Sequence, residues 1–304
     1  MTKREMEAML STQISSDSKP VRARTAIPPP IFNESSSSSS SSNVFDPAVL
    51  EDCAVEDDGL ASFGGHGTLE ILRLIRVLEE NGACCCVTGT SALIYYGADR
   101  HRNAWEICLP TEQLEDAKRL LMSPPYKHEY TLIRTPSVTQ PQSLAHIYPR
   151  FKCVGLDLSF QLLPSQDCHF ECKPSNFQRS HNGLPYPRLH VFVQSLLDTH
   201  NLVALCDVVD GTNVSEEWGF SNLDLSGTND VDWALWKNRA IRDSDQSMRL
   251  FGVTTAAYSR QETWEKIVRG KEERLGFKHP KEIFATRFRL HGSADPWLTY
   301  RKAA

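Results

Sequence analysis

Residues 87–109, VTGTSALIYYGADRHRNAWEICL, decide the fold that we expect for this chain. An apolar run over residues 84–87 leads into the small-residue turn Gly89-Thr90-Ser91, and a short apolar segment over residues 92–96 follows. Residues 105–109 form a second strand-like run. The order of strand, tight turn, short helix and strand predicts an α/β unit. In such a unit the backbone N–H groups of the turn lie near a helix start, where anions are favoured.

Apolar spacing extends this unit on both sides. Residues 68–80 repeat apolar side chains at helical intervals, and Thr68 is a plausible N-cap for this helix. Residues 112–122 show the same helical pattern. Residues 153–163 alternate apolar and polar side chains, which predicts a strand with Asp157 on the face opposite to the apolar one.

The C-terminal third is expected to be mainly helical. Asp230 is placed to cap one helix, and Ser259-x-x-Glu262 has the form of a capping box that opens another. Pro280 stands where the first position of a last helix is expected. Residues 201–210 are apolar, and their pattern leaves open whether they form a helix or a strand.

These patterns predict an α/β (α+β) fold, with a mixed sheet flanked by helices and followed by a helical C-terminal region. Composition divides the chain into four parts. A serine-rich tail over residues 1–45 buries too little apolar surface to offset its ordering entropy, so we expect it to be disordered. The other parts are an acidic linker over residues 46–66, a core domain over residues 67–228 and a basic helical region over residues 229–304.

The net charge of −5 is unevenly distributed. It amounts to about +1 over residues 1–45, about −13 over residues 46–236 and about +7 over residues 237–304. An acidic middle and a basic end favour docking of the C-terminal segment on the core. Binding of nucleic acid by the basic end is the less favoured alternative, because its Lys and Arg residues alternate with Glu as on a solvated helix face.

Hydrophobic residues make up 40% of the 304 residues, which is sufficient for a core. The sequence lacks an apolar stretch long enough to span a bilayer, and its first residues, MTKREMEAML, lack the hydrophobic region of a secretory signal. We therefore expect a cytoplasmic protein without membrane contact. Three of the nine cysteines are consecutive at residues 84–86 and are interpreted as buried reduced thiols.

The segment Cys168-His169-x-x-Cys172, with Cys153 nearby in sequence, is a weak candidate for a zinc site. Thiolate and imidazole are zinc ligands, but the spacing is loose and a second paired set is lacking in the sequence. A Cys–His nucleophile has no supporting local signature. Ordinary buried thiols are therefore the preferred interpretation.

The residues around the opening stretch resemble the polymerase-β-like nucleotidyltransferase superfamily. Gly89-Thr90 resembles the Gly-[Gly/Ser] turn of that superfamily, and Ala104-Trp105-Glu106-Ile107 falls where it has Asp-h-[Asp/Glu]-h. Leu156-Asp157-Leu158 falls where it has the third acid. The resemblance spans residues 67–165, about a third of the chain. Val209-Asp210-Gly211 and Glu217-Trp218-Gly219 also look like stretches of fungal proteins of this type.

In that superfamily, alternate carboxylates on one strand face hold two divalent ions that orient a triphosphate. Here the first acid position is Ala104, and a methyl group cannot ligate Mg²⁺. The resemblance therefore implies a degenerate member, noncatalytic or weakly active, that requires no cofactor. We expect it to bind a nucleotide or another phosphorylated small molecule through residues Gly89, Thr90, Ser91, Arg100 and Arg102.

Two alternatives remain open. The first is an active Mg²⁺-dependent nucleotidyltransferase that uses Glu106 and Asp157 as metal ligands, in a one-metal arrangement or with Asp99 reaching in from the loop. The second is a protein-interaction or accessory module that uses the serine-rich tail and the basic end to bind a protein partner.

Overall fold

The computed structural model describes residues 59–98, 100–134, 142–244 and 252–274. All of them belong to the unit Glu56–Ala304, one of two units into which the chain divides. The predicted disordered tail and the predicted helix from Pro280 lie outside the described residues, and the domain boundaries stay predictions.

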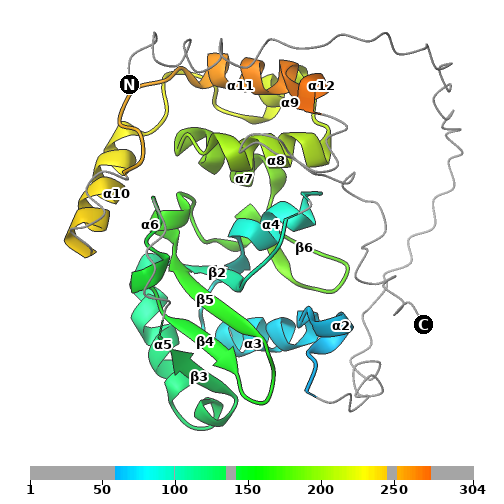
Figure 1. Cartoon of the computed structure of the whole chain (residues 1–304), viewed down its shortest axis with the longest axis vertical. Helices are drawn as coiled ribbons and strands as arrows, with labels where there is room; N and C mark the ends of the chain where they lie inside the picture. Colours follow the sequence, from blue (N-terminus) through cyan, green and yellow to red (C-terminus); the bar gives the residue numbers. More distant parts are fainter. Residues whose placement is uncertain (1–58, 99, 135–141, 245–251, 275–304) are drawn as a thin grey trace, which may run out of the picture. The chain divides into compact units, whose positions relative to one another are not determined.

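One mixed sheet forms the centre of the fold (Figure 1). Its strand order is β1-β2-β5-β4-β3, in which β2 and β5 are parallel and the other neighbours are antiparallel. The strands are β1 (Cys86–Val87), β2 (Trp105–Leu109), β3 (Tyr130–Ile133), β4 (Arg150–Cys153) and β5 (Ser159–Pro164). A separate hairpin pairs β6 (Phe177–Arg179) with β7 (Pro185–Pro187).

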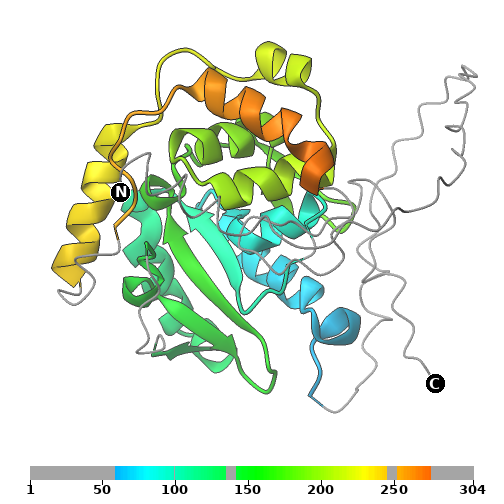
Figure 2. The same ribbon diagram turned by 45° about the horizontal axis from the view of Figure 1, so that its top comes forward.

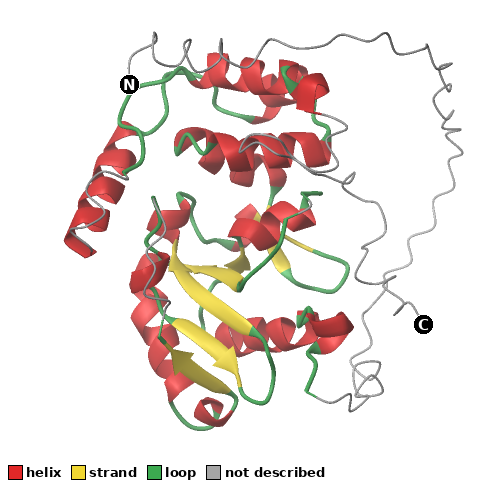
Figure 3. Ribbon diagram, in the orientation of Figure 1, coloured by secondary structure: helices red, strands yellow, loops and turns green. Residues whose placement is uncertain are grey.

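Helices precede, interrupt and follow the sheet (Figure 3). Those before residue 170 are α2 (Ser62–Gly65), α3 (Thr68–Glu80), α4 (Gly89–Tyr95), α5 (Leu114–Met122) and α6 (Ser165–Cys168). The later ones are α7 (Leu189–Asp198), α8 (Leu202–Thr212), α9 (Glu216–Asn222), α10 (Val231–Ser244), α11 (Arg260–Arg269) and α12 (Lys271–Arg274). Short 3₁₀ turns lie at Thr111–Gln113, Tyr126–His128, Ala145–Ile147 and Pro174–Asn176.

The predicted fold class is confirmed, because a mixed sheet flanked by helices is followed by a helical C-terminal part. The opening order is also as predicted: β1 enters a small-residue turn, α4 follows, and β2 spans Trp105–Leu109. Helix α3 has the predicted bounds, but its N-cap is Gly67 rather than Thr68. Gly67 has a φ of 75°, a left-handed conformation that glycine adopts without the steric cost of a side chain.

The predicted long strand over residues 153–163 is wrong in its first half. Strand β4 ends at Cys153, the chain turns, and β5 begins at Ser159, so that β4 and β5 form an antiparallel pair. Gly155 allows the reversal with a φ of 79°. The alternation of apolar residues continues through the turn, where Val154 is 54% exposed, and therefore does not report a pleated strand there.

Helices α7, α8 and α11 pack together beyond the sheet, and Figure 2 shows α11 lying across the other two. Two glycines, in the stretches Val209–Gly211 and Glu217–Gly219, allow other close contacts in this part of the fold. A side chain at Gly211 of α8 would overlap the carbonyl of Tyr96, and a side chain at Gly219 of α9 would overlap the indole of Trp264. These stretches therefore contribute to helix packing in this chain.

The basic C-terminal part docks on the acidic middle through ion pairs. Arg274 lies 2.8 Å from the fully buried carboxylate of Asp210 in α8, and its own side chain is 15% exposed. Arg269 of α11 lies 2.8 Å from Glu216 in α9. Within the described residues, which end at Arg274, the basic end therefore contacts the acidic middle, as the docking interpretation predicts; residues 275–304 lie outside them.

Candidate functional site

One face of the sheet carries the residue that the resemblance assigns to metal binding. Successive side chains of a strand point to opposite faces, so Glu106 and Cys108 of β2 share one face. Gln161 of β5 is the register partner of Glu106, and Cys86 of β1 is that of Cys108. We call this surface, defined by Cys86, Glu106, Cys108 and Gln161, the Glu106 face.

The small-residue turn before α4 holds the carboxylate of Glu106. The backbone N–H of Thr90 donates to Glu106 Oε2 at 2.7 Å. Gly89 has a φ of 57°, and a Cβ at this position would overlap the same carboxylate. Burial raises the pKa of Glu106, although the hydrogen bond from Thr90 acts in the opposite direction. The turn that is predicted to bind an anionic ligand therefore binds the carboxyl group of Glu106 instead.

The alternative that uses Glu106 and Asp157 together as metal ligands requires their side chains to lie close to each other, and the structure does not bring them together. Asp157 lies in the turn before β5, where its side chain is fully exposed and 3.1 Å from Lys152. The residue of β5 in register with Glu106 is Gln161, whose amide donates to the carbonyls of Tyr148 and Ala145. The β5 residue in register with Glu106 is therefore an amide and not a carboxylate.

A different carboxylate, that of Asp167, lies near Glu106. Asp167 follows β5 in α6, and its charge is one cause of the raised pKa of Glu106. It forms an ion pair with Lys237 of α10 and accepts a hydrogen bond from Tyr148. No local pattern singles out Asp167, because residues 164–187 have the composition of a loop and its partner Lys237 lies 70 residues away.

The donor set of the Glu106 face does not fit two Mg²⁺ ions. Ala104 lies two residues before Glu106, just outside β2. Gln161 lies on the neighbouring strand β5, in register with Glu106. Glu106 is therefore the one carboxylate among these three positions, and it is bound to Thr90. Asp167 is neutralised by Lys237, whereas Asp99 lies outside the described residues. Magnesium requires near-octahedral oxygen ligands, and a two-ion site requires carboxylates shared between the ions.

Among the other predicted ligand-binding residues, Arg100 and Arg102 are engaged by the chain itself, and Ser91 is buried. Arg100 pairs with the buried carboxylate of Asp207 through Nε and Nη2, at 2.7 and 3.0 Å. Arg102 lies 3.6 Å from the ring centroid of Trp105 and donates to the carbonyl of a neighbouring loop. Ser91 is 1% exposed. Binding of an anionic ligand by these residues stays a prediction, and their geometry does not favour it.

A shallow, widely open surface cleft of about 310 Å³ is also present. It lies where the parallel strands β2 and β5 end, the position at which open α/β sheets commonly bind ligands. Its walls combine hydroxyl, amide, imidazole and aromatic side chains. The lining residues are Thr111, Ser165, Gln166, His169, Phe170 and Trp233.

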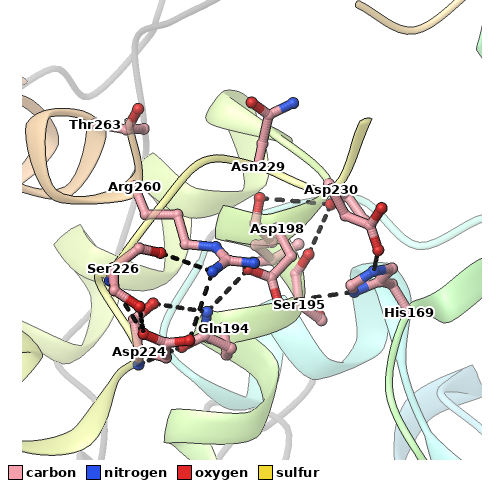
Figure 4. A network of polar contacts seen from close by, with 12 residues as sticks. His169, Gln194, Ser195, Asp198, Asp224, Ser226, Asn229, Asp230, Arg260 and Thr263 are labelled. Atoms are coloured by element: carbon pink, nitrogen blue, oxygen red, sulfur yellow. Dashed lines mark hydrogen bonds and ion pairs between the residues drawn. The ribbon is translucent and has the colours of Figure 1, made fainter. Parts of the chain in front are cut away.

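Polar contacts fix one wall of this cleft. Figure 4 shows His169 directed toward Asp230, with His169 Nε2 and Asp230 Oδ2 2.9 Å apart. Asp230 also caps α10 by accepting from the backbone N–H of Trp233 at 2.8 Å, as the sequence predicts. On the other side of the network, Arg260 of α11 lies 2.6 Å from Asp198 of α7. The imidazole of His169 is therefore held by Asp230, which lies 61 residues further along the chain.

Comparison with known proteins gives no family assignment. The chain matches no protein-family model and no curated protein. Two solved structures from Helicobacter pylori are similar over most of their length. JHP933 is 13% identical, with 68% of this chain and 91% of that chain covered and a TM-score of 0.30. The other is described provisionally as a nucleotidyltransferase and is 12% identical. The similarity covers 71% of this chain and 99% of that chain, with a TM-score of 0.28. Similarity at this level does not bear on the site.

Within the described ranges, none of the helices is both long enough and apolar enough to cross a membrane. The expected cytoplasmic location stays a prediction.

Proposed function

We propose that this chain is a noncatalytic protein on a nucleotidyltransferase-like fold that binds a nucleotide. The observation that carries the first half of this proposal is that the three predicted acid positions, Ala104, Glu106 and Asp157, place one carboxylate on this face. Position 104 is an alanine, and Asp157 lies in the exposed turn before β5, while the amide of Gln161 stands in register with Glu106. Two-metal catalysis depends on oxygen ligands that an alanine cannot provide and an amide provides without charge.

The cleft at the ends of β2 and β5 supports the second half of the proposal, which is that the chain binds a nucleotide. Its volume of about 310 Å³ falls at the lower end of small-molecule sites, which span roughly 300–1,000 Å³. Phe170 and Trp233 offer ring faces on which a nucleobase can stack, and such stacking is worth about 1–3 kcal/mol per base. Thr111, Ser165 and Gln166 offer hydrogen-bonding groups for the sugar and the base edge. The proposed site thus lies beyond the C-terminal ends of β2 and β5, whereas the antiparallel pairing of β1 and β2 puts the Gly89 turn near the start of β2.

A thermal-shift titration with the four ribonucleoside triphosphates and their monophosphates tests this proposal. We expect at least one nucleotide to stabilise the wild type without added metal, by about 2.7 kcal/mol at 100 times its Kd. Phe170→Ala should weaken this stabilisation, because a stacking face is lost. Phe220→Ala, a change at a 51% exposed phenylalanine of α9, is the matched control and should leave it unchanged. A flat titration across all these nucleotides contradicts the ligand-binding half of the proposal.

One observation favours an active metal-dependent nucleotidyltransferase as a second candidate. Asp167 lies near enough to Glu106 for its charge to affect the pKa of Glu106. If Asp167 released its ion pair with Lys237 and bound a metal ion, the carboxylates of Asp167 and Glu106 could share that ion. In that case nucleotide stabilisation would require Mg²⁺ or Mn²⁺ and would be lost in Glu106→Ala.

A further inference from the structure

Three cysteines from separate parts of the chain converge at one end of the Glu106 face. Cys86 and Cys108 are register partners on β1 and β2, and Cys172 follows α6 in a loop. The sulfur atoms of all three lie within 4.8 Å of one another, and those of Cys172 and Cys108 are 3.5 Å apart. We call Cys86, Cys108 and Cys172 the thiol cluster.

The chain geometry brings a fourth sulfur beside this cluster. Cys168 is the last residue of α6, and its thiol lies near that of Cys108, outside the group of three whose sulfurs all lie within 4.8 Å of one another. The following residue, His169, ends α6 in the left-handed conformation with a φ of 56°. This reversal returns the chain so that Cys172 also reaches the sheet.

The arrangement suits a thiophilic cation. Zinc binds thiolates at about 2.3 Å in a tetrahedron, which requires sulfur atoms roughly 3.8 Å apart. The thiol cluster meets this spacing with small side-chain movements, because its sulfurs already lie within 4.8 Å of one another. Cys86 and Cys108 are fully buried, whereas Cys172 is half-buried and gives the cluster a side toward solvent.

We propose that the thiol cluster binds one thiophilic cation of the Zn²⁺ class, with Cys168 completing a four-sulfur set. The oxygen ligands that the superfamily pattern expects on this face are mostly missing, and sulfur ligands lie two residues further along β2. Soft thiolates select zinc or copper(I) over magnesium. The ion would join β1, β2 and the α6 loop, and so fix the wall of the nucleotide cleft formed by Ser165, His169 and Phe170.

This inference does not depend on nucleotide binding or on catalysis. It corrects the pairing considered from sequence, because Cys153 lies on β4, apart from the cluster, and the partners of Cys172 come from β1 and β2. The cysteine ligands come from distant segments, so the metal site does not exist in the unfolded chain. The free energy of metal binding therefore adds to the free energy of folding. Removal of the metal should therefore lower the melting temperature of the wild type.

The test uses the full chain, purified under reducing conditions and equilibrated with zinc before excess metal is removed. We expect about one equivalent of tightly bound zinc per chain. Cys108→Ala and Cys172→Ala should each lose it. Cys206→Ala and Cys153→Ala are matched controls, because these buried cysteines lie outside the cluster. Both controls should retain the zinc.

Cobalt substitution of the wild type provides a measurement that does not depend on the folding of any variant. Tetrahedral thiolate coordination gives Co²⁺ intense visible bands and a sulfur-to-metal charge-transfer band. Cys168→Ala should retain a weaker-binding ion with reduced charge-transfer intensity. Less than about a tenth of an equivalent of zinc, with no such cobalt bands, overturns the proposal. A Cys108–Cys172 disulfide that persists in reductant, seen by mass spectrometry, overturns it as well.

Discussion

Lys237→Ala is expected to destabilise the protein by about 3–5 kcal/mol, because it leaves the carboxylate of Asp167 buried and unpaired. The side chains of Lys237 and Asp167 are 7% and 11% exposed, respectively. The lysine also lies 5.6 Å from the ring centroid of Trp233, so its removal loses packing on α10 in addition to charge. Urea denaturation at neutral pH measures the change in the free energy of unfolding.

Lys173→Ala is the matched control for this substitution. Lys173 pairs with Glu171 at 2.6 Å, but the two side chains are 46% and 69% exposed. Exposed ion pairs contribute about 0–1 kcal/mol. The double variant Lys237→Ala/Asp167→Ala should be less destabilised than the sum of the single variants, because neither charge is then left alone. Equal effects of Lys237→Ala and Lys173→Ala would contradict a buried pair.

Trp264→Ala is expected to cost about 3–5 kcal/mol, the range for loss of a large buried aromatic side chain. Trp264 of α11 is fully buried, its indole lies against Gly219, and its Nε1 donates to the carbonyl of Glu216 at 3.2 Å. Its ring centroid is 5.9 Å from that of Trp218. The residue therefore joins α11 to α9, and the same urea experiment measures its contribution.

Phe220→Ala is the control for this second substitution. Phe220 lies on α9, next to Gly219, but is 51% exposed, so the change should stay within roughly 0.5 kcal/mol. If Trp264→Ala left the free energy of unfolding unchanged, α11 would not belong to the cooperatively folded unit, and the docking of the basic end would be contradicted.

Local sequence patterns predict the elements of this fold well. Helix α3 has the predicted bounds because its apolar residues recur at helical spacing. Strand β2 has the predicted bounds because it is a short, mostly apolar run that ends at a proline. The caps at Asp230 and Ser259 are likewise local, since each side chain accepts a hydrogen bond from an N–H three residues later. The β4–β5 turn was missed because apolar residues continue to alternate through Gly155.

The site depends on long-range pairing, which one sequence does not reveal. That Gln161, not Asp157, lies beside Glu106 follows from the parallel register of β2 and β5. Arg100 could be recognised in the sequence as a basic residue, but its partner Asp207 is 107 residues away. The convergence of Cys172 with Cys86 and Cys108 has the same origin, because antiparallel pairing of β1 and β2 and the path of the α6 loop determine it.

We propose that the Glu106 face does not support two-metal chemistry. The most direct test is transfer of label from radioactive nucleoside triphosphates to protein, nucleic-acid and small-molecule acceptors, with Mg²⁺ or Mn²⁺, by the wild type and by Glu106→Gln. We expect no difference between the two proteins and no transfer above background, because Ala104 provides no ligand, Gln161 is uncharged and Asp167 is paired with Lys237. Metal-dependent transfer by the wild type that Glu106→Gln abolishes would show that catalysis survives on this face.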